Sequence, residues 1–257
     1  MYLKKNNKLS TKFNLKGYII LNLDSESKKE LQQIQDIIIR NKDNLKLQNE
    51  LYKTGFHKSI LKRNIKKIVN IINEKKYENV AITSFIHLRT VKKSNRKSDN
   101  SFVGFHRETF YSNYKYTKYQ INVTVPLMNY DVNNSMRIIE KSHKIQDNKI
   151  KTKKLTSKES GIKRFSAKHK LGLPYNPKII LSGVNLKKSI RVKLKTNQFM
   201  IFSGQLIHGN WSNHKEKERY SIDFGLIKKK YLKGFKVKDH KHVSYSSSGK
   251  YWEDLIF

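Results

Sequence analysis

Residues 198–211 have the sequence QFMIFSGQLIHGNW, in which two short apolar runs are separated by Ser203 and Gly204. Runs of this length, bounded by turn residues, are typical of buried strands in antiparallel all-β domains. The same pattern recurs from about residue 80 onward, where we expect further strands at Val80–Leu88, Phe102–Phe105, Tyr119–Leu127, Met136–Ile139, Lys178–Leu181, Ile190–Leu194 and Tyr220–Ile227. Many short strands at this spacing indicate a mainly β fold, an antiparallel sandwich or barrel of the jelly-roll type.

The N-terminal part of the chain has a different pattern. Gly17–Leu23 is largely apolar and predicts a buried strand, and the next two residues, Asp24 and Ser25, are good N-cap residues for a helix. Helical periodicity follows twice, first at Leu31, Ile34, Ile37 and Ile38, and then, in a helix from near Ser59, at Leu61, Ile65, Ile68, Val69 and Ile72. Helices that precede the strands without alternating with them argue against a doubly wound α/β fold.

We therefore expect a single domain over residues 1–257. It would consist of an N-terminal helical part at about 1–78, a jelly-roll core at about 79–230 and a C-terminal tail at about 231–257. A basic insert at about 146–170 interrupts the core; it is Lys-rich and has little periodicity, which is typical of a functional lid or a loop. Trp252 and Leu255 indicate that the end of the tail packs against the domain.

Composition excludes several functional classes. The chain has no cysteine, which rules out disulfide scaffolds, zinc fingers, iron–sulfur clusters and thiol catalysis. Its hydrophobic fraction of 37% and aromatic fraction of 11% are too high for a typical disordered chain. No apolar run approaches the roughly 20 residues of a membrane span, and residues 1–15 contain no apolar signal core. We expect a cytoplasmic protein without a membrane span.

The charge balance has two competing explanations. The chain has 55 basic and 20 acidic residues, a net charge of +35, and only nine of the basic residues are Arg. Such an excess permits binding to nucleic acid or another polyanion. However, Arg is the residue that recognises phosphates and bases by bidentate hydrogen bonds. The joint abundance of Lys, Asn and Ile also fits the composition of an A/T-rich genome, so both explanations stay open here.

Three residues form a candidate metal site. His106 and Glu108 are two positions apart at the end of an apolar run, so in a strand both side chains point to the same face. His208 ends another apolar run. Two His and one carboxylate form the facial triad of non-haem Fe(II) oxygenases, which leaves coordination positions open. A cupin-like Mn or Zn enzyme could use the same ligands, and a His near a Glu is by itself also common on protein surfaces.

A candidate anion-binding pair follows the third of these residues. Arg219 lies eleven residues after His208 and begins a strand on which Ser221 shares its face. A guanidinium and a hydroxyl in this arrangement can hold one end of a dicarboxylate.

The order of these motifs resembles that of the phytanoyl-CoA dioxygenase family. The resemblance runs from about residue 13 to about residue 228 and rests on Gly17-Tyr18-Ile19-Ile20, His106-x-Glu108, Val125-Pro126-Leu127, Asn133–Lys144, His208 and Arg219. Within it, residues 134–144 are similar to the passage of this family that contains Pro-Gly-Ser-His. Two positions depart from the family pattern. Glu108 stands where most members have Asp, and Glu140-Lys141 stands where they usually have Pro-Gly.

The resemblance implies a double-stranded β-helix (jelly-roll, cupin-like) core that uses Fe(II), 2-oxoglutarate as co-substrate, and O2. The implied metal ligands are His106, Glu108 and His208, and the candidate 2-oxoglutarate residues are Arg219, Ser221, Gln120 and Asn122. Candidate substrate residues near this site are Tyr111, Arg137, His143 and Trp211. By strand alternation, we expect Arg107 to face away from the metal, on the surface.

The expected function is hydroxylation, or another oxidation, of a small or carrier-linked metabolite, with succinate and CO2 as co-products. The basic insert would suit a substrate that bears a phosphate. The alternative is a non-catalytic basic jelly-roll protein that binds nucleic acid or another polyanion. In either case we expect a monomer or a homodimer.

Overall fold

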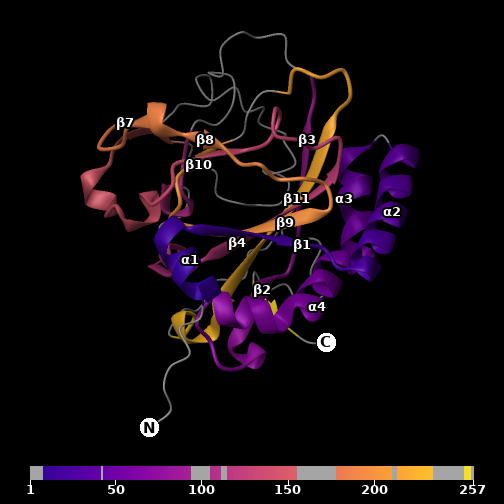
Figure 1. The fold of residues 1–257 in the computed structure, drawn as a ribbon, viewed down its shortest axis with the longest axis horizontal. Coiled ribbons are helices and arrows are strands. Elements are labelled where there is room, and N and C mark those ends of the chain that lie inside the picture. Colours follow the sequence, from indigo (N-terminus) through magenta and orange to yellow (C-terminus); the bar gives the residue numbers. More distant parts are fainter. Residues whose placement is uncertain are drawn as a thin grey trace.

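A computed structural model describes residues 8–41, 43–93, 105–110, 115–154, 178–209, 213–233 and 252–255 (Figure 1). The helices are α1 (Lys8–Lys16), α2 (Ser25–Arg40), α3 (Asn44–Lys53) and α4 (Phe56–Ile71). The strands are β1 (Tyr18–Asn22), β2 (Val80–Thr83), β3 (His87–Val91), β4 (Ile121–Met128), β5 (Arg137–Ile138), β6 (Lys151–Lys154), β7 (Lys178–Ser182), β8 (Ile190–Arg191), β9 (Gln198–Ser203), β10 (His208–Gly209), β11 (Arg219–Lys228) and β12 (Trp252–Asp254).

The strands form three antiparallel sheets. The large sheet has seven strands in the order β1-β9-β4-β11-β2-β12, with β3 also paired to β11. A three-stranded sheet, β10-β5-β8, packs against it through a shared apolar cluster. Within the described ranges, the third sheet consists of β6 and β7. Two antiparallel sheets packed in this way, with helices on the outside, form a jelly-roll core, so the predicted fold class is confirmed.

Several elements differ from the sequence-based expectations. The run Val80–Leu88 is divided between β2 and β3, and β8 and β10 have only two residues each. Helix α3 was not expected, and β6 lies within the region that was expected to be an irregular basic insert. The prediction that the C-terminal end packs against the domain is confirmed, because β12 pairs with β2 and Trp252 is buried.

Strand alternation gives the large sheet an apolar face and a partly polar face. On β4, Val123, Val125 and Leu127 are fully buried in the core cluster that includes the helices, while Asn122 and Thr124 point to the opposite side. The corresponding residues of β11 are Ile222, Phe224 and Leu226 on the helix side, and Ser221 and Asp223 on the other. A row of polar side chains therefore lies inside the jelly roll.

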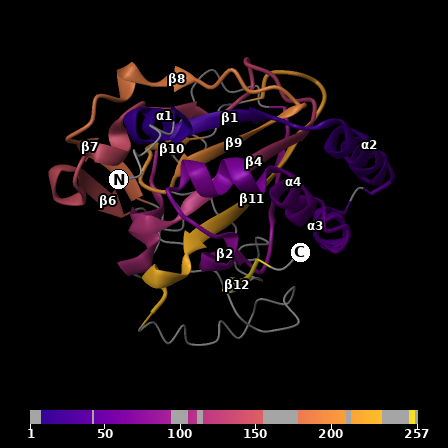
Figure 2. The same cartoon turned by 60° about the horizontal axis from the view of Figure 1, so that its bottom comes forward.

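Helices α2 and α3 lie at one end of the molecule and β6 and β7 at the other, while α4 extends from α2 and α3 toward α1, as Figure 1 and Figure 2 show. The predicted apolar stripe of α2 is buried at Leu31, Ile34 and Ile38. The side-chain amide of Gln35 donates to the carbonyl of Leu127 at 2.8 Å, which ties this helix to β4. No helix within the described ranges has both the length and the hydropathy that crossing a bilayer requires.

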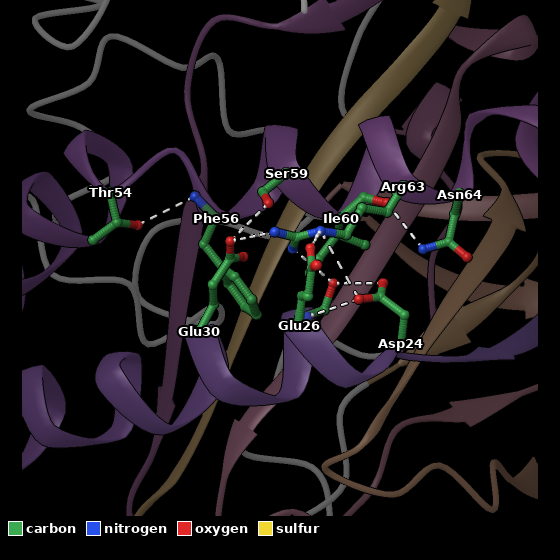
Figure 3. A network of polar contacts seen from close by, with 10 residues as sticks. Asp24, Glu26, Glu30, Thr54, Phe56, Ser59, Ile60, Arg63 and Asn64 are labelled. Atoms are coloured by element: carbon green, nitrogen blue, oxygen red, sulfur yellow. Dashed lines mark hydrogen bonds and ion pairs between the residues drawn. The ribbon is translucent and has the colours of Figure 1, made fainter.

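Arg63 on α4 connects this helix to the first turns of α2 (Figure 3). Its Nε donates to Glu26 Oε2 at 3.0 Å, and its Nη2 donates to Glu30 Oε1 at 2.7 Å. Asp24 caps α2, as predicted, by accepting a hydrogen bond from the backbone N–H of Ser27 at 2.9 Å. This network stabilises the helix layer on the outer side of the large sheet.

His57 on α4 is buried where this layer meets the sheet. Its exposed fraction is 1%, and its ring lies 5.4 Å from that of Tyr52 and 5.7 Å from that of Phe224. Neither ring nitrogen has a hydrogen-bond partner among the described residues. Burial lowers the pKa of His57 to about 3, so the folded protein holds this imidazole neutral.

This histidine predicts a specific pH dependence of stability. Below the ordinary His pKa of about 6.5, the unfolded chain binds a proton that the folded chain does not, which costs about 1.4 kcal/mol of unfolding free energy per pH unit. The cost is absent at higher pH and grows until the pH approaches 3. We therefore expect His57→Leu to gain about 2 kcal/mol relative to the wild type between pH 7.5 and pH 5, measured by urea unfolding. Identical pH profiles for the two proteins would contradict this account.

Candidate metal centre

The structure brings His106, Glu108 and His208 together. One potential ligand atom from each residue lies within 4.8 Å of the other two. The backbones of the two histidines form an isolated antiparallel bridge, in which each N–H donates to the other residue's carbonyl at 2.9 Å. Their ring centroids are 4.3 Å apart, and His208 Nε2 lies 3.9 Å from Glu108 Oε1. Both histidines are buried, so the three side chains form a compact site inside the protein.

Glu108 reaches this site from a turn of helix. It begins a 3-10 helix, Glu108–Phe110, and its backbone N–H donates to the carbonyl of Gly204 at 2.8 Å. A Cβ atom at Gly204 would lie 3.0 Å from Glu108 Cγ and 2.9 Å from the carbonyl oxygen of Gln120. The absence of a side chain at position 204 therefore makes room for the glutamate. The predicted convergence of His106 and Glu108 is found, although a regular strand is not what produces it.

The hydrogen bonding of His208 suits metal binding. Its Nδ1 lies 2.8 Å from the carbonyl oxygen of Leu206. Because a carbonyl only accepts, Nδ1 carries the proton and the lone pair is on Nε2, the nitrogen that faces Glu108. Burial lowers the pKa of His208, which favours the neutral form. A neutral imidazole with a fixed tautomer is the form that ligates metals.

Two amides hold the carboxylate of Glu108. The amide nitrogen of Asn122 donates to Glu108 Oε1 at 2.7 Å, and that of Gln120 donates to Asn122 Oδ1 at 2.8 Å. Both amides are buried at the start of the inner face of β4. The sequence suggested both amides as contacts for a co-substrate. In the structure, the Asn122 amide instead holds the carboxylate of Glu108 by a hydrogen bond to Oε1, and this hydrogen bond does not involve Oε2.

Arg219 and Ser221 lie on the inner face at the start of β11, and both are buried. The guanidinium of Arg219 is 1% exposed, donates from Nη1 to the carbonyl of Asn134 and lies 5.0 Å from the ring centroid of Tyr130. Its Nε has no hydrogen-bond partner among the described residues. Burial lowers the pKa of Arg219, but a guanidinium stays charged at neutral pH. Burial of a cation with an unpaired N–H donor costs free energy unless an anion accepts a hydrogen bond from that donor.

A half-buried ion pair lies between the two ends of this polar row. Asp223 accepts from Thr124 Oγ1 at 2.6 Å and from Arg89 Nε at 2.7 Å. The positive charge of Arg89 and the hydrogen bonds outweigh burial and lower the pKa of Asp223. Sequence reasoning missed both members of this pair. Strand alternation could have placed Asp223 beside Ser221, but nothing in the sequence near Arg89 indicates its partner.

The other predicted site residues have different surroundings. Arg137 pairs with Gly209 on β10, next to the metal site, and its guanidinium lies over the ring of Phe105 at 5.5 Å. His143 contacts the N-terminal part instead, where its Nε2 lies 3.0 Å from the carbonyl oxygen of Asn14. The remaining two candidates, Tyr111 and Trp211, lie outside the described residues.

One expectation was wrong. Arg107 is fully buried, with 0% exposed, and donates to the carbonyls of Ser142 and Ile145 and to Asp147.

The departure at Glu140-Lys141 is accommodated locally. Lys141 has a φ of 65°, in the left-handed region that favours glycine, so the backbone can keep the turn that Pro-Gly would form.

Comparison with known proteins shows likeness in fold only. No protein family and no curated protein matches the sequence. Among solved structures, EvdO2 from Micromonospora carbonacea var. aurantiaca has a TM-score of 0.62 at 10% identity, over 89% of this chain and 92% of that one. EctD from S. alaskensis, solved with 2-oxoglutarate and 5-hydroxyectoine, has a TM-score of 0.53 at 12% identity, over 88% and 78%.

A third similar structure is the epimerase SnoN in complex with Fe3+, alpha-ketoglutarate and nogalamycin RO. Its TM-score is 0.52 at 11% identity, over 86% of this chain and 82% of that one. None of these three structures is named as a phytanoyl-CoA dioxygenase. The comparisons therefore support the jelly-roll fold, and the resemblance to that particular family stays a prediction.

The amide pair predicts how metal affinity depends on Asn122. Replacing Asn122 by Ala removes the donor to Glu108, so we expect about tenfold weaker Mn(II) binding by isothermal titration calorimetry. The matched control is Asn185→Ala, which removes a surface side chain that caps a 3-10 turn. Equal affinities in the wild type and the Asn122 variant would show that the amide does not orient the carboxylate.

Proposed function

We propose that this chain is an Fe(II)- and 2-oxoglutarate-dependent oxygenase that acts on a small or carrier-linked metabolite. The observation that carries the proposal is the cluster of His106, Glu108 and His208 inside a jelly roll, in which both histidines are buried. Two imidazoles and one carboxylate, with no thiolate, suit Fe(II) and leave coordination positions for other ligands.

The residues present fit the metal. The tautomer of His208 directs Nε2 toward the cluster, and the bond from Asn122 holds the Glu108 carboxylate so that one oxygen is available to the ion. His106 is fixed beside them by its backbone bridge. In such sites, the bound iron supplies the one-electron and O2 chemistry that no side chain can provide.

The residues also fit a dicarboxylate co-substrate. The unpaired Nε of Arg219 and the hydroxyl of Ser221 lie on the inner face of β11, and together they would hold the C5 carboxylate of 2-oxoglutarate. The structures of EvdO2 with 2-oxoglutarate, at a TM-score of 0.60 and 9% identity, and of SnoN with iron and alpha-ketoglutarate support this role by analogy of fold.

The chain's own contribution is positioning and exclusion of water. Asn122 and Gln120 orient the acidic ligand, and the walls of the jelly roll bury both histidines. Asp223 lies two residues after Ser221 on β11 and opposite Thr124, so its ion pair with Arg89 adds polar groups to the same face of the sheet. We propose hydroxylation as the outcome; SnoN, an epimerase, shows that this fold also supports other reactions.

The first test is turnover of 2-oxoglutarate to succinate by the full chain with Fe(II) and O2. We expect His106→Ala and His208→Ala to abolish succinate formation, because each removes a metal ligand. His214→Ala removes an exposed histidine six residues after His208 in the sequence; it is the matched control and should keep wild-type turnover. If the wild type binds no metal and instead binds RNA with a steep salt dependence, the polyanion-binding alternative holds.

A second test addresses the anion-binding pair. Loss of a charge-assisted hydrogen bond costs about 1.5–3 kcal/mol, so Arg219→Met should raise KM for 2-oxoglutarate about 10- to 100-fold. Ser221→Ala should raise it less, by about five- to tenfold. Steady-state kinetics with varied 2-oxoglutarate measure both effects, and thermal melting checks that each variant is folded. An unchanged KM in the folded Arg219 variant would place the co-substrate elsewhere.

A further inference from the structure

We propose that Arg107 is a positioning residue of the metal centre, which acts through the segment Ser142–Asp147 to hold all three ligand residues in register. The inference rests on the proposed metal-binding function. It assigns a role to a side chain that cannot reach the metal itself, because it lies between two ligands and points away from both of them.

Arg107 donates three hydrogen bonds from its two Nη atoms, while its Nε has no hydrogen-bond partner among the described residues. Its Nη2 donates to the carbonyl of Ser142 at 2.8 Å, and its Nη1 donates at 2.8 Å both to the carbonyl of Ile145 and to Asp147 Oδ1. An Arg with no exposed surface is rare, because desolvation of the charge is expensive unless partners replace water. These partners therefore fix the guanidinium, and with it the backbone that carries His106 and Glu108.

The same segment also holds the strand of the third ligand. The backbone N–H of Ile207, the residue before His208, donates to Ser142 Oγ at 2.7 Å. The carbonyl of Ile207 accepts from the backbone N–H of Ile139 at 2.9 Å. The Ser142–Asp147 segment thus contacts a residue adjacent to each of the three ligands. It connects two parts of the chain that are about 100 residues apart in sequence.

A second polar contact and an apolar layer complete this connection. Thr109, the residue after Glu108, donates to Asp147 Oδ1 at 3.2 Å or to Gln205 Oε1 at 3.0 Å. Beneath these contacts lies an apolar cluster whose buried members are Phe110, Ile139, Ile150 and Ile207. The guanidinium of Arg107 lies 5.9 Å from the ring centroid of Phe110.

The geometry explains why arginine is needed here. The three acceptors of Arg107 lie on different residues, and the planar fork of its guanidinium reaches them from two nitrogens held a fixed distance apart. A lysine keeps the charge but donates from a single nitrogen. Since metal sites lose affinity when their ligands shift by about 0.5 Å, a partial loss of these bonds should be detected at the metal.

The experiment measures Co(II) binding to the full chain by calorimetry, together with the ligand-field absorption of the bound ion and the melting temperature of the metal-free protein. We expect Arg107→Lys and Ser142→Ala to weaken Co(II) binding about 10- to 100-fold and to shift the absorption bands. Asp147→Asn keeps an acceptor oxygen and should have a smaller effect in the same direction. The matched control is Arg63→Lys, which disturbs another arginine network, on the helix layer.

The control should lower the melting temperature while changing the Co(II) affinity by less than about twofold. If Arg107→Lys does not fold, Ser142→Ala and Asp147→Asn still decide the question, because both lie outside the ligand-bearing strands. Folded variants with wild-type affinity and spectrum, or an equal loss of affinity in the Arg63 variant, would overturn this inference alone. If the wild type does not bind Co(II), or binds it equally after His106→Ala, the metal centre itself is wrong and this inference falls with it.

Discussion

The candidate site depends on two hydrogen bonds between the backbones of His106 and His208. This pair of reciprocal N–H to carbonyl bonds, each 2.9 Å long, sets two side chains from distant parts of the chain side by side. An antiparallel bridge fixes both the separation and the direction of the opposed residues, so the imidazoles converge, with ring centroids 4.3 Å apart. Glu108, its supporting amides and the Ser142–Asp147 segment are arranged around this bridge.

The large sheet makes such a polar site compatible with a stable fold. Because residues alternate across a strand, β4 and β11 supply apolar side chains to the helix layer and polar ones to the interior of the jelly roll. Packing against the helices and the polar site therefore use different residues of the same strand. Burial of Val123, Val125 and Leu127 stabilises the sheet, and the polar side chains between them are held in fixed positions by that packing.

Part of this architecture could be predicted from the sequence. Short apolar runs and turn residues are local signals, and they predicted most strands. The i, i+2 spacing also predicted that His106 and Glu108 converge, but Glu108 reaches the site from a 3-10 turn and not from the expected strand. The role of Arg107 could not be predicted, because its partners at Ser142, Ile145 and Asp147 come from a segment whose position only the tertiary fold defines. Helix α3 was missed for a different reason: it has only ten residues, and its two buried leucines, Leu47 and Leu51, cover little more than one helical turn.

The contact between Gly204 and Glu108 has a consequence for how such a site can change over evolutionary time. The longer carboxylate of Glu is accommodated because its neighbour has no Cβ, which would otherwise lie 3.0 Å from Glu108 Cγ. Exchange to the shorter Asp would relieve one of the two clashes that an alanine at position 204 would make, whereas the alanine alone would displace the ligand. The contact with the backbone carbonyl oxygen of Gln120, at 2.9 Å, would remain after that exchange, so position 204 is constrained to glycine whichever acidic residue is the ligand.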